Sequence, residues 1–372
     1  MRVVIAPDGF GGTLTPTQAA AAVAAGWRSA APGDVLVPAP LSDGGPGLLE
    51  VLSAARPAAV LHPVEVEDPL ARPVQAGVLL DGGTAYVESA AACGLHLLAD
   101  RERDLRRTTT YGVGQLVAAA LDLGATRIVV GLGGSATNDG GAGLLAALGV
   151  QRLDSAGERL AAGGAALRDL DRLVGTPDPR LRDVELVAAT DVDSPLLGLR
   201  GASAVFGPQK GASREDVALL DGSLTRWADV LEAHLDVAVR DEPGAGAAGG
   251  LGAALLALGA RREPGLALVE RLVGLREQVA QADLVVTGEG TFDFSSLTGK
   301  VVSGVAALAA EHAVPCLVLA GAVRVGRREA AAAGIEAAYA VVDAVGVQAA
   351  LARPAEELAA LAARVARQWS RR

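Results

Sequence analysis

Cysteine is nearly absent from this chain of 372 residues, and histidine is scarce. Cys93 and Cys316 are too few for a disulfide framework, so the sequence favours a reducing compartment and predicts a cytoplasmic protein. The four histidines, at positions 62, 96, 234 and 312, lack metal-binding spacings such as HExxH. A histidine metal centre and a disulfide scaffold are therefore not expected. Cys93 has no activating motif near it and is expected to be buried.

A long, strongly apolar run and an excess of positive charge are also missing. The uncharged stretch at 244–260 is mostly glycine and alanine, too weakly apolar to span a bilayer. The first residues predict a strand and not a signal peptide. The net charge of −10 and the pI of about 5.0 argue against nucleic acid or an anionic membrane as a partner. The predicted partner is a small-molecule substrate, and the chain is expected to act as a monomer or homodimer.

Lysine is the scarcest charged residue, with two lysines against 31 arginines. Lys210 and Lys300 both lie in glycine-containing loops. A compact ammonium can act as a point charge on phosphate where a planar guanidinium cannot replace it. We therefore predict that both lysines contact phosphate from solvated loops, with little role in folding. Chance survival of two lysines is the alternative.

The order of predicted elements indicates an α/β protein with two domains. Alternating strands and helices open the chain, and buried strands near 283–287, 316–319 and 338–341 close it. These elements predict a flavodoxin- or Rossmann-like, doubly wound parallel sheet of five strands, built from residues 1–65 and 283–372. Residues 66–282 are predicted to form an inserted second α/β domain, with antiparallel strands between 62 and 88.

A glycine-rich stretch at 131–143 is the most informative segment of the predicted insert. It carries six glycines between a predicted strand at 128–130 and a predicted helix at 144–148. Glycine weakens helices and strands, but it lets backbone N–H groups approach an anion at a helix start. We therefore predict ligand binding here, with a flexible turn as the alternative. The predicted binding residues are Gly133, Gly134, Ser135, Thr137, Asn138 and Asp139.

Carboxylates follow several predicted strands, where α/β sheets bind ligands. Four of them are predicted to bind substrate or nucleotide: Asp8, Asp43, Glu289 and Asp293. A nucleotide kinase must neutralise the transferring phosphate, hold Mg²⁺ and position the attacking hydroxyl. We predict Asp191 and Asp193 as Mg²⁺ ligands, and Asp191, Lys210 and Lys300 as catalytic residues. A single acid in such a loop is more often a turn or helix-cap residue. The prediction therefore rests on several acids that all follow predicted strands.

Two other nucleotide motifs fit less well. The loop before Lys300 is not a Walker A loop, because Phe294 and Val301 occupy the positions of the first glycine and of the hydroxyl. Residues 131–136 match a loose dinucleotide fingerprint, with Asp154 downstream, but the helix of that motif would have to contain residues 138–141. A dehydrogenase is therefore disfavoured.

With these residues in view, the chain resembles the bacterial type I glycerate kinase family over nearly its whole length. Seven blocks in order carry the resemblance: 6–8, 42–45, 131–149, 191–195, 204–212, 244–252 and 287–290 through 299–300. The blocks GGSATNDGGAG and VFGPQKGA are the most specific. The resemblance implies ATP- and Mg²⁺-dependent phosphorylation of D-glycerate, usually on the 2-hydroxyl. It also implies two α/β domains with the site between them.

The chain departs from the family pattern in three loops. Gly9 and Gly11 stand where the family usually has serine and lysine, and Pro46 replaces a glutamate. Thr291 and Ser295 replace an arginine and a glutamine. Lost cationic contacts cost a few kcal/mol each when nothing replaces them, so either the substrate differs or activity is low. A catalytically weak paralogue that binds nucleotide or organic acid as a sensor is the alternative function.

Overall fold

The computed structural model describes residues 1–297 and 300–370, and its chain divides into two compact units. Unit 1 comprises Met1–Asp43, Glu50–Arg56 and Leu266–Arg372, and unit 2 comprises Gly44–Leu49 and Pro57–Gly265. Both contain parallel strands and helices, so the predicted two-domain α/β fold is confirmed. In the described part of the chain, no helix is long and apolar enough to cross a membrane.

Unit 1 is built on five parallel strands in the order β15-β13-β11-β1-β2. This is the predicted five-stranded sheet. Its strands are short, and the three central ones are buried along most of their length, which is the pattern of a sheet covered on both faces. Their bounds are β1 (Arg2–Ile5), β2 (Val35–Pro38), β11 (Leu284–Thr287), β13 (Cys316–Ala320) and β15 (Ala337–Ala340).

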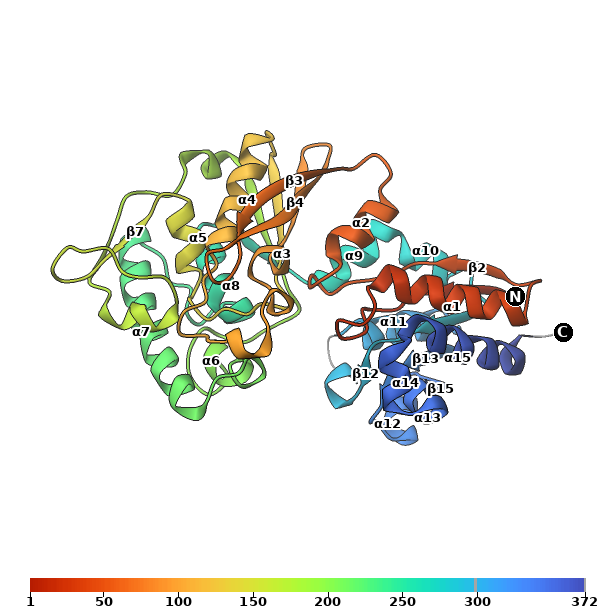
Figure 1. Ribbon diagram of the computed structural model, residues 1–372. Coiled ribbons are helices and arrows are strands. Elements are labelled where there is room, and N and C mark those ends of the chain that lie inside the picture. The colour runs from red at the N-terminus through yellow and green to blue at the C-terminus, as the bar shows by residue number, and fades with distance from the viewer. Residues whose placement is uncertain (298–299, 371–372) are drawn as a thin grey trace. The chain divides into compact units, whose positions relative to one another are not determined.

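Helices α1 (Pro16–Ala30) and α15 (Pro354–Trp369) pack side by side on one face of this sheet (Figure 1). Val3 and Ile5 share a core with Trp27 of α1 and Leu361 of α15. Val4 lies between them and therefore points to the opposite face, which α11 (Val301–Glu311) helps to cover. The first turn of α1 is set by Thr15, whose side chain accepts from the Gln18 N–H at 3.2 Å in a capping box.

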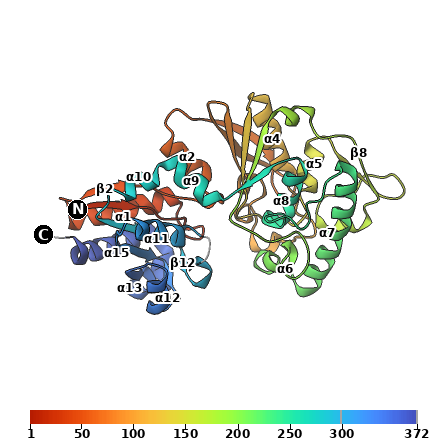
Figure 2. The same ribbon diagram turned by 180° about the vertical axis from the view of Figure 1, so that it is seen from behind.

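Unit 2 contains a six-stranded sheet in the order β10-β9-β6-β5-β4-β3. The predicted antiparallel segment is present as β3 (Val60–Glu67), β4 (Pro73–Asp81) and β5 (Thr84–Glu88). The other three strands run parallel to β5: β6 (Arg127–Gly131), β9 (Glu185–Ala189) and β10 (Arg261–Glu263). The main helices around the sheet are α4 (Tyr111–Asp122), α5 (Ala142–Ala147), α7 (Arg214–Leu235) and α8 (Ala247–Ala257), seen from behind in Figure 2.

The α7 helix begins after the Ser213 cap, and its Trp227 is buried. The uncharged glycine and alanine stretch that begins at residue 244 is largely helical from residue 247. It enters α8 through three residues with positive φ, Ala248, Gly249 and Gly250. A Cβ at Gly249 would lie 1.9 Å from the Thr137 carbonyl oxygen, so glycine is required for this approach.

The limits of the units differ from those predicted from the sequence, which were 1–65 with 283–372 for the first domain and 66–282 for the second. Residues 57–65 join unit 2 because β3 pairs with β4 along its whole length. Residues 266–282, with α9 (Gly265–Val273) and α10 (Leu275–Val279), join unit 1. Alternation of side chains indicates that segments are strands, but it does not say which sheet they extend.

Candidate functional site

Three carboxylates of unit 1 follow neighbouring strands of its sheet, and we call them the acidic cluster. Asp8 follows β1, Asp43 lies in the loop after β2, and Glu289 follows β11. These strands are adjacent and parallel, so their carboxyl ends meet at one edge. Burial, together with the nearby charges of Asp43 and Glu289, raises the pKa of Asp8 to about 8. Burial also raises the pKa of Glu289, which is only 8% exposed.

Lys300 is the cation of this cluster. Its charge opposes the rise in the pKa values of both Asp8 and Glu289. Lys300 Nζ donates to Ser295 Oγ at 2.9 Å, and Ser295 donates in turn to Asp293 Oδ1 from its N–H and its hydroxyl. These bonds from Ser295 lower the pKa of the Asp293 carboxyl. Thr298 and Gly299 of the predicted lysine loop lie outside the described residues.

Lys210 occupies the centre of a second cluster, in unit 2, which we call the lysine site. Its ammonium donates to Ser135 Oγ at 2.8 Å and to the Thr137 carbonyl oxygen at 2.9 Å. The side chain is almost fully buried, and burial lowers its pKa to about 8. The prediction of a solvated loop lysine was wrong here, because Lys210 ends a short 3₁₀ helix, Pro208–Lys210, and its side chain alone of the three is buried.

The backbone of the segment that Lys210 contacts carries N–H groups that could bind a ligand. In the part of the chain that the structure describes, the N–H groups of Gly133, Gly134 and Ser135 donate to no protein acceptor. Two backbone hydrogen bonds to residues 93–95 fix the position of this segment. The Leu95 N–H donates to the Gly134 carbonyl at 2.8 Å, and the Ala136 N–H donates to the Cys93 carbonyl at 2.7 Å. Successive free N–H groups of this kind can form a concave site for an anion.

The glycines of this stretch also have a packing role. A Cβ at Gly131 would lie 2.4 Å from the Gly44 carbonyl oxygen, and one at Gly133 would lie 2.6 Å from the Gly45 Cα. A Cβ at Gly134 would meet the ring of Pro46 at 2.7 Å. Residues 44–46, which belong to unit 2, therefore lie directly on this glycine backbone, and glycine is needed for packing whether or not a ligand binds. Pro46, one of the departures from the family pattern, is part of that contact.

Asp139 and Asn138 are tied into the interior of unit 2. The Asp139 carboxylate is fully buried and accepts from the hydroxyls of Thr109 and Thr110 and from the N–H groups of Thr110, Gly141 and Gly143. Asn138 donates to Ser203 Oγ at 2.9 Å. Thr137 donates from its hydroxyl to the Ala248 carbonyl at 3.4 Å. These contacts give the three side chains a role in shaping the loop, which the sequence did not predict.

The predicted metal ligands follow β9. Asp191 is half-buried, and Asp193 is exposed and forms an ion pair with Arg262 of β10. No group of three or more His, Cys, Asp or Glu side chains in the described ranges is arranged to hold a metal ion. Cys93, beside the lysine site, is buried as predicted. Burial raises the pKa of its thiol to about 12, so the thiol is a poor nucleophile.

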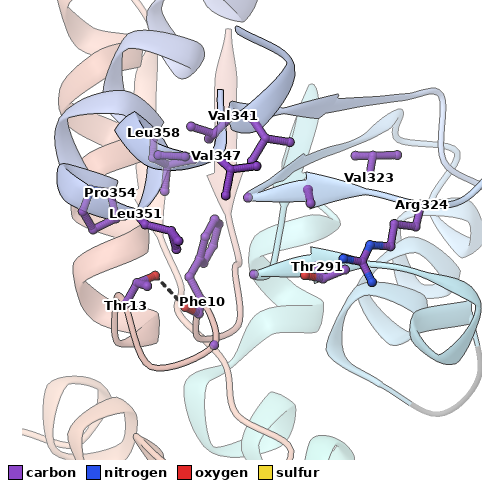
Figure 3. A pocket seen from close by; sticks show the side chains of 16 residues that line it. Phe10, Thr13, Thr291, Val323, Arg324, Val341, Val347, Leu351, Pro354 and Leu358 are labelled. Atoms are coloured by element: carbon purple, nitrogen blue, oxygen red, sulfur yellow. Dashed lines mark hydrogen bonds between the residues drawn. The ribbon is translucent and has the colours of Figure 1, made fainter. Parts of the chain in front are cut away.

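Unit 1 also contains a cavity of about 510 Å³ at the carboxyl edge of its sheet (Figure 3). Loops after β1, β11 and β13 form one wall, and α14 (Val347–Ala352) and α15 form another. Gly11 and Thr291, two of the positions that depart from the family pattern, line this cavity. Sequence reasoning missed it because its walls come from segments far apart in the chain.

Comparisons with known proteins agree over the whole chain. The model of the "Glycerate kinase family" matches residues 3–370. The chain is 42% identical to a glycerate 2-kinase of Escherichia coli K12, over 93% of this chain and 92% of that protein. It is 44% identical to a glycerate kinase of Bacillus subtilis 168, over 92% and 90%. A crystal structure from Salmonella typhimurium LT2, assigned as glycerate kinase 2, superposes with a TM-score of 0.79 at 40% identity and covers 99% of this chain and 98% of that one.

Proposed function

Because the chain belongs to the glycerate kinase family, we propose that it transfers the γ-phosphate of ATP to the 2-hydroxyl of D-glycerate, giving 2-phosphoglycerate. The motif resemblance to this family is confirmed, and with it an activity that phosphorylates glycerate. The phosphate donor, the cation and the position phosphorylated are our proposal.

The observation that carries the proposed chemistry is the lysine site. Phosphoryl transfer needs little covalent help from the protein, and most of the acceleration comes from positioning and from balancing negative charge. Lys210, bonded to Ser135 Oγ, supplies positive charge, and the same segment supplies the free N–H groups of Gly133, Gly134 and Ser135. We assign to them the binding of phosphate oxygens.

The acidic cluster supplies the proton acceptor in this proposal. A general base works best when its pKa lies near the working pH, and that of Asp8 is about 8. We assign Asp8 to accept the proton of the attacking hydroxyl, with Asp43 and Glu289 maintaining its basicity. Lys300, linked through Ser295 to Asp293, is assigned to balance charge on the transferring group.

Mg²⁺ fits one of the two predicted ligands better than the other. Mg²⁺ is held by one or two carboxylates together with water and phosphate oxygens, so a preformed cage is not required. Asp191 is half-buried at a strand end, which suits this role. Asp193 is already neutralised by Arg262, and it could serve only if that ion pair opened. When bound, Mg²⁺ would neutralise phosphate charge.

A coupled assay of ADP release tests the function directly. Purified protein with Mg²⁺-ATP is expected to turn over D-glycerate faster than other small hydroxy acids, and ³¹P NMR is expected to identify the product as the 2-phosphate. No ADP release with any acid of the panel would overturn the proposal. Ligand binding by calorimetry with turnover at background would favour the sensor alternative instead.

We retain the cytoplasmic location and the monomeric or homodimeric state as parts of the proposal. Both cysteines are free and buried, which fits a reducing compartment. Light scattering during size-exclusion chromatography would measure the oligomeric state.

A further inference from the structure

We propose that the cavity of unit 1 binds the base and ribose of the phosphate donor. This inference rests on the proposed function, because it says where the nucleotide of that reaction is held. The cavity lies outside the carboxyl ends of β1, β11, β13 and β15, and so includes the β1–β11 position of a sheet with the order β2-β1-β11-β13-β15. In this topology the strand order reverses at that position, and crevices outside the carboxyl ends of such strands are where open α/β sheets take their ligands.

The size and lining of the cavity fit a nucleoside better than glycerate. A volume of about 510 Å³ is in the usual range for small-molecule sites, which are mostly apolar with a few polar groups. The Phe10 ring points into the centre, and Val347, Leu351 and Leu358 face it from the two helices (Figure 3). A purine has an apolar face to bury against such a wall. A three-carbon acid with a carboxylate and two hydroxyls does not.

The opposite wall carries one hydroxyl and one cation. Thr291 and Arg324 lie across the cavity from Leu351 (Figure 3). The Arg324 side chain is exposed, and no salt bridge or side-chain hydrogen bond joins it to another of the described residues. A guanidinium at the rim of an apolar cavity that is available to bind an anion suits a ligand that is apolar at one end and anionic at the other.

The same loops carry the cavity and the acidic cluster. Phe10 follows Asp8 by two residues, and Gly290 is next to Glu289. Their backbones are in close contact, since a Cβ at Gly290 would lie 3.0 Å from the Gly11 nitrogen and one at Gly321 would lie 2.5 Å from the Gly290 carbonyl oxygen. A nucleoside in this cavity would therefore lie next to the loops of unit 1 that carry the acidic cluster.

Two variants with matched controls test the assignment. Leu351→Glu puts a carboxylate on the apolar wall, and Gln348→Glu adds the same charge to α14 at a residue that does not line the cavity. Arg324→Gln removes the rim cation, and Arg327→Gln removes one from the exposed surface nearby. Leu351 is 63% exposed, so the substitutions should not impair folding, and melting temperatures would verify this.

ADP affinity is measured by calorimetry and the KM values for ATP and D-glycerate by the coupled assay. We expect Leu351→Glu and Arg324→Gln each to weaken ADP binding and to raise the KM for ATP about tenfold or more, or ~1.4 kcal/mol. The KM for glycerate should change less than about twofold in the two variants, and the controls should match the wild type. Unchanged ADP affinity in both variants, or a raised KM for glycerate alone, would overturn the inference.

Failure of the inference can be told from failure of the proposed function. If the wild type turns over ATP and glycerate but the cavity variants keep its ADP affinity, the nucleoside binds elsewhere and the function stands. If the wild type binds ADP through this cavity but releases none from ATP with any acid, the site stands and the kinase proposal fails. A wild type that binds neither ADP nor ATP would overturn both.

Discussion

Lys210 donates from its buried ammonium to the hydroxyl oxygen of Ser135, 2.8 Å away, and thereby joins the VFGPQKGA turn to the glycine-rich stretch. The two residues are 75 positions apart in the chain. The same ammonium also donates to the Thr137 carbonyl at 2.9 Å. Lys210 therefore stabilises the loop whose free N–H groups we assign to phosphate, so its loss should affect both stability and turnover.

We predict that Lys210→Arg lowers the free energy of unfolding by about 2–4 kcal/mol and also lowers kcat/KM. The planar guanidinium is larger than the ammonium and cannot keep both short bonds in a buried site. Urea denaturation and steady-state kinetics measure the two effects. Wild-type stability would show that the site tolerates a guanidinium and would contradict the buried structural role.

Lys300→Arg should behave differently. Lys300 is partly exposed and bonded to Ser295, so the melting temperature should stay within a degree or two of the wild type. We expect kcat/KM to fall by roughly ten- to a thousand-fold, about 1.4–4 kcal/mol of transition-state stabilisation. A substitution of an exposed arginine distant from the acidic cluster, Arg364→Lys, is the control. Wild-type kinetics for Lys300→Arg would show that catalysis does not require lysine at this position.

Asp8 should make the wild type less stable as the pH rises. Its pKa is about 8 in the folded protein against an ordinary value of 3.8, so between these values the folded state binds more protons than the unfolded state. Asp8 therefore makes its full contribution to the free energy of unfolding below about pH 4, and this contribution is lost as the pH rises to about 8. Denaturation of Asp8→Asn across this range should show the variant gaining stability relative to the wild type. Asp343→Asn, at the exposed surface, is the control. A constant difference between Asp8→Asn and the wild type would contradict the raised pKa.

Gly133→Ala should destabilise unit 2 by about 1–3 kcal/mol, as overpacking does elsewhere. The new Cβ would lie 2.6 Å from the Gly45 Cα, and backbone cannot move aside as a flexible side chain can. Gly222→Ala in α7 is the matched control, since nothing lies within 4 Å of its Cβ. The control should gain about 0.5–1 kcal/mol because alanine favours helix. Equal stability of Gly133→Ala and the wild type would show that the glycine serves only ligand approach.

The sequence by itself determined the family, the α/β class and most of the secondary structure. Caps such as Thr15 and Ser213 act over a single turn, and buried strands such as Leu284–Thr287 carry their pattern within a few residues. Such local signals can be read without knowing the fold. The glycines of the central stretch were also evident, but the sequence did not say whether backbone or ligand would fill the space they leave.

Tertiary structure decided what the polar and charged residues do. Lys210 and Lys300 look alike in the sequence, yet the fold buries one against Ser135 and leaves the other partly exposed beside Asp293. Asp139 looked like a ligand-binding acid, and the fold surrounds it with donors from Thr109 and Thr110. Burial, pKa and hydrogen-bond partners depend on chain segments that meet only after folding, so residue type and spacing alone could not determine them.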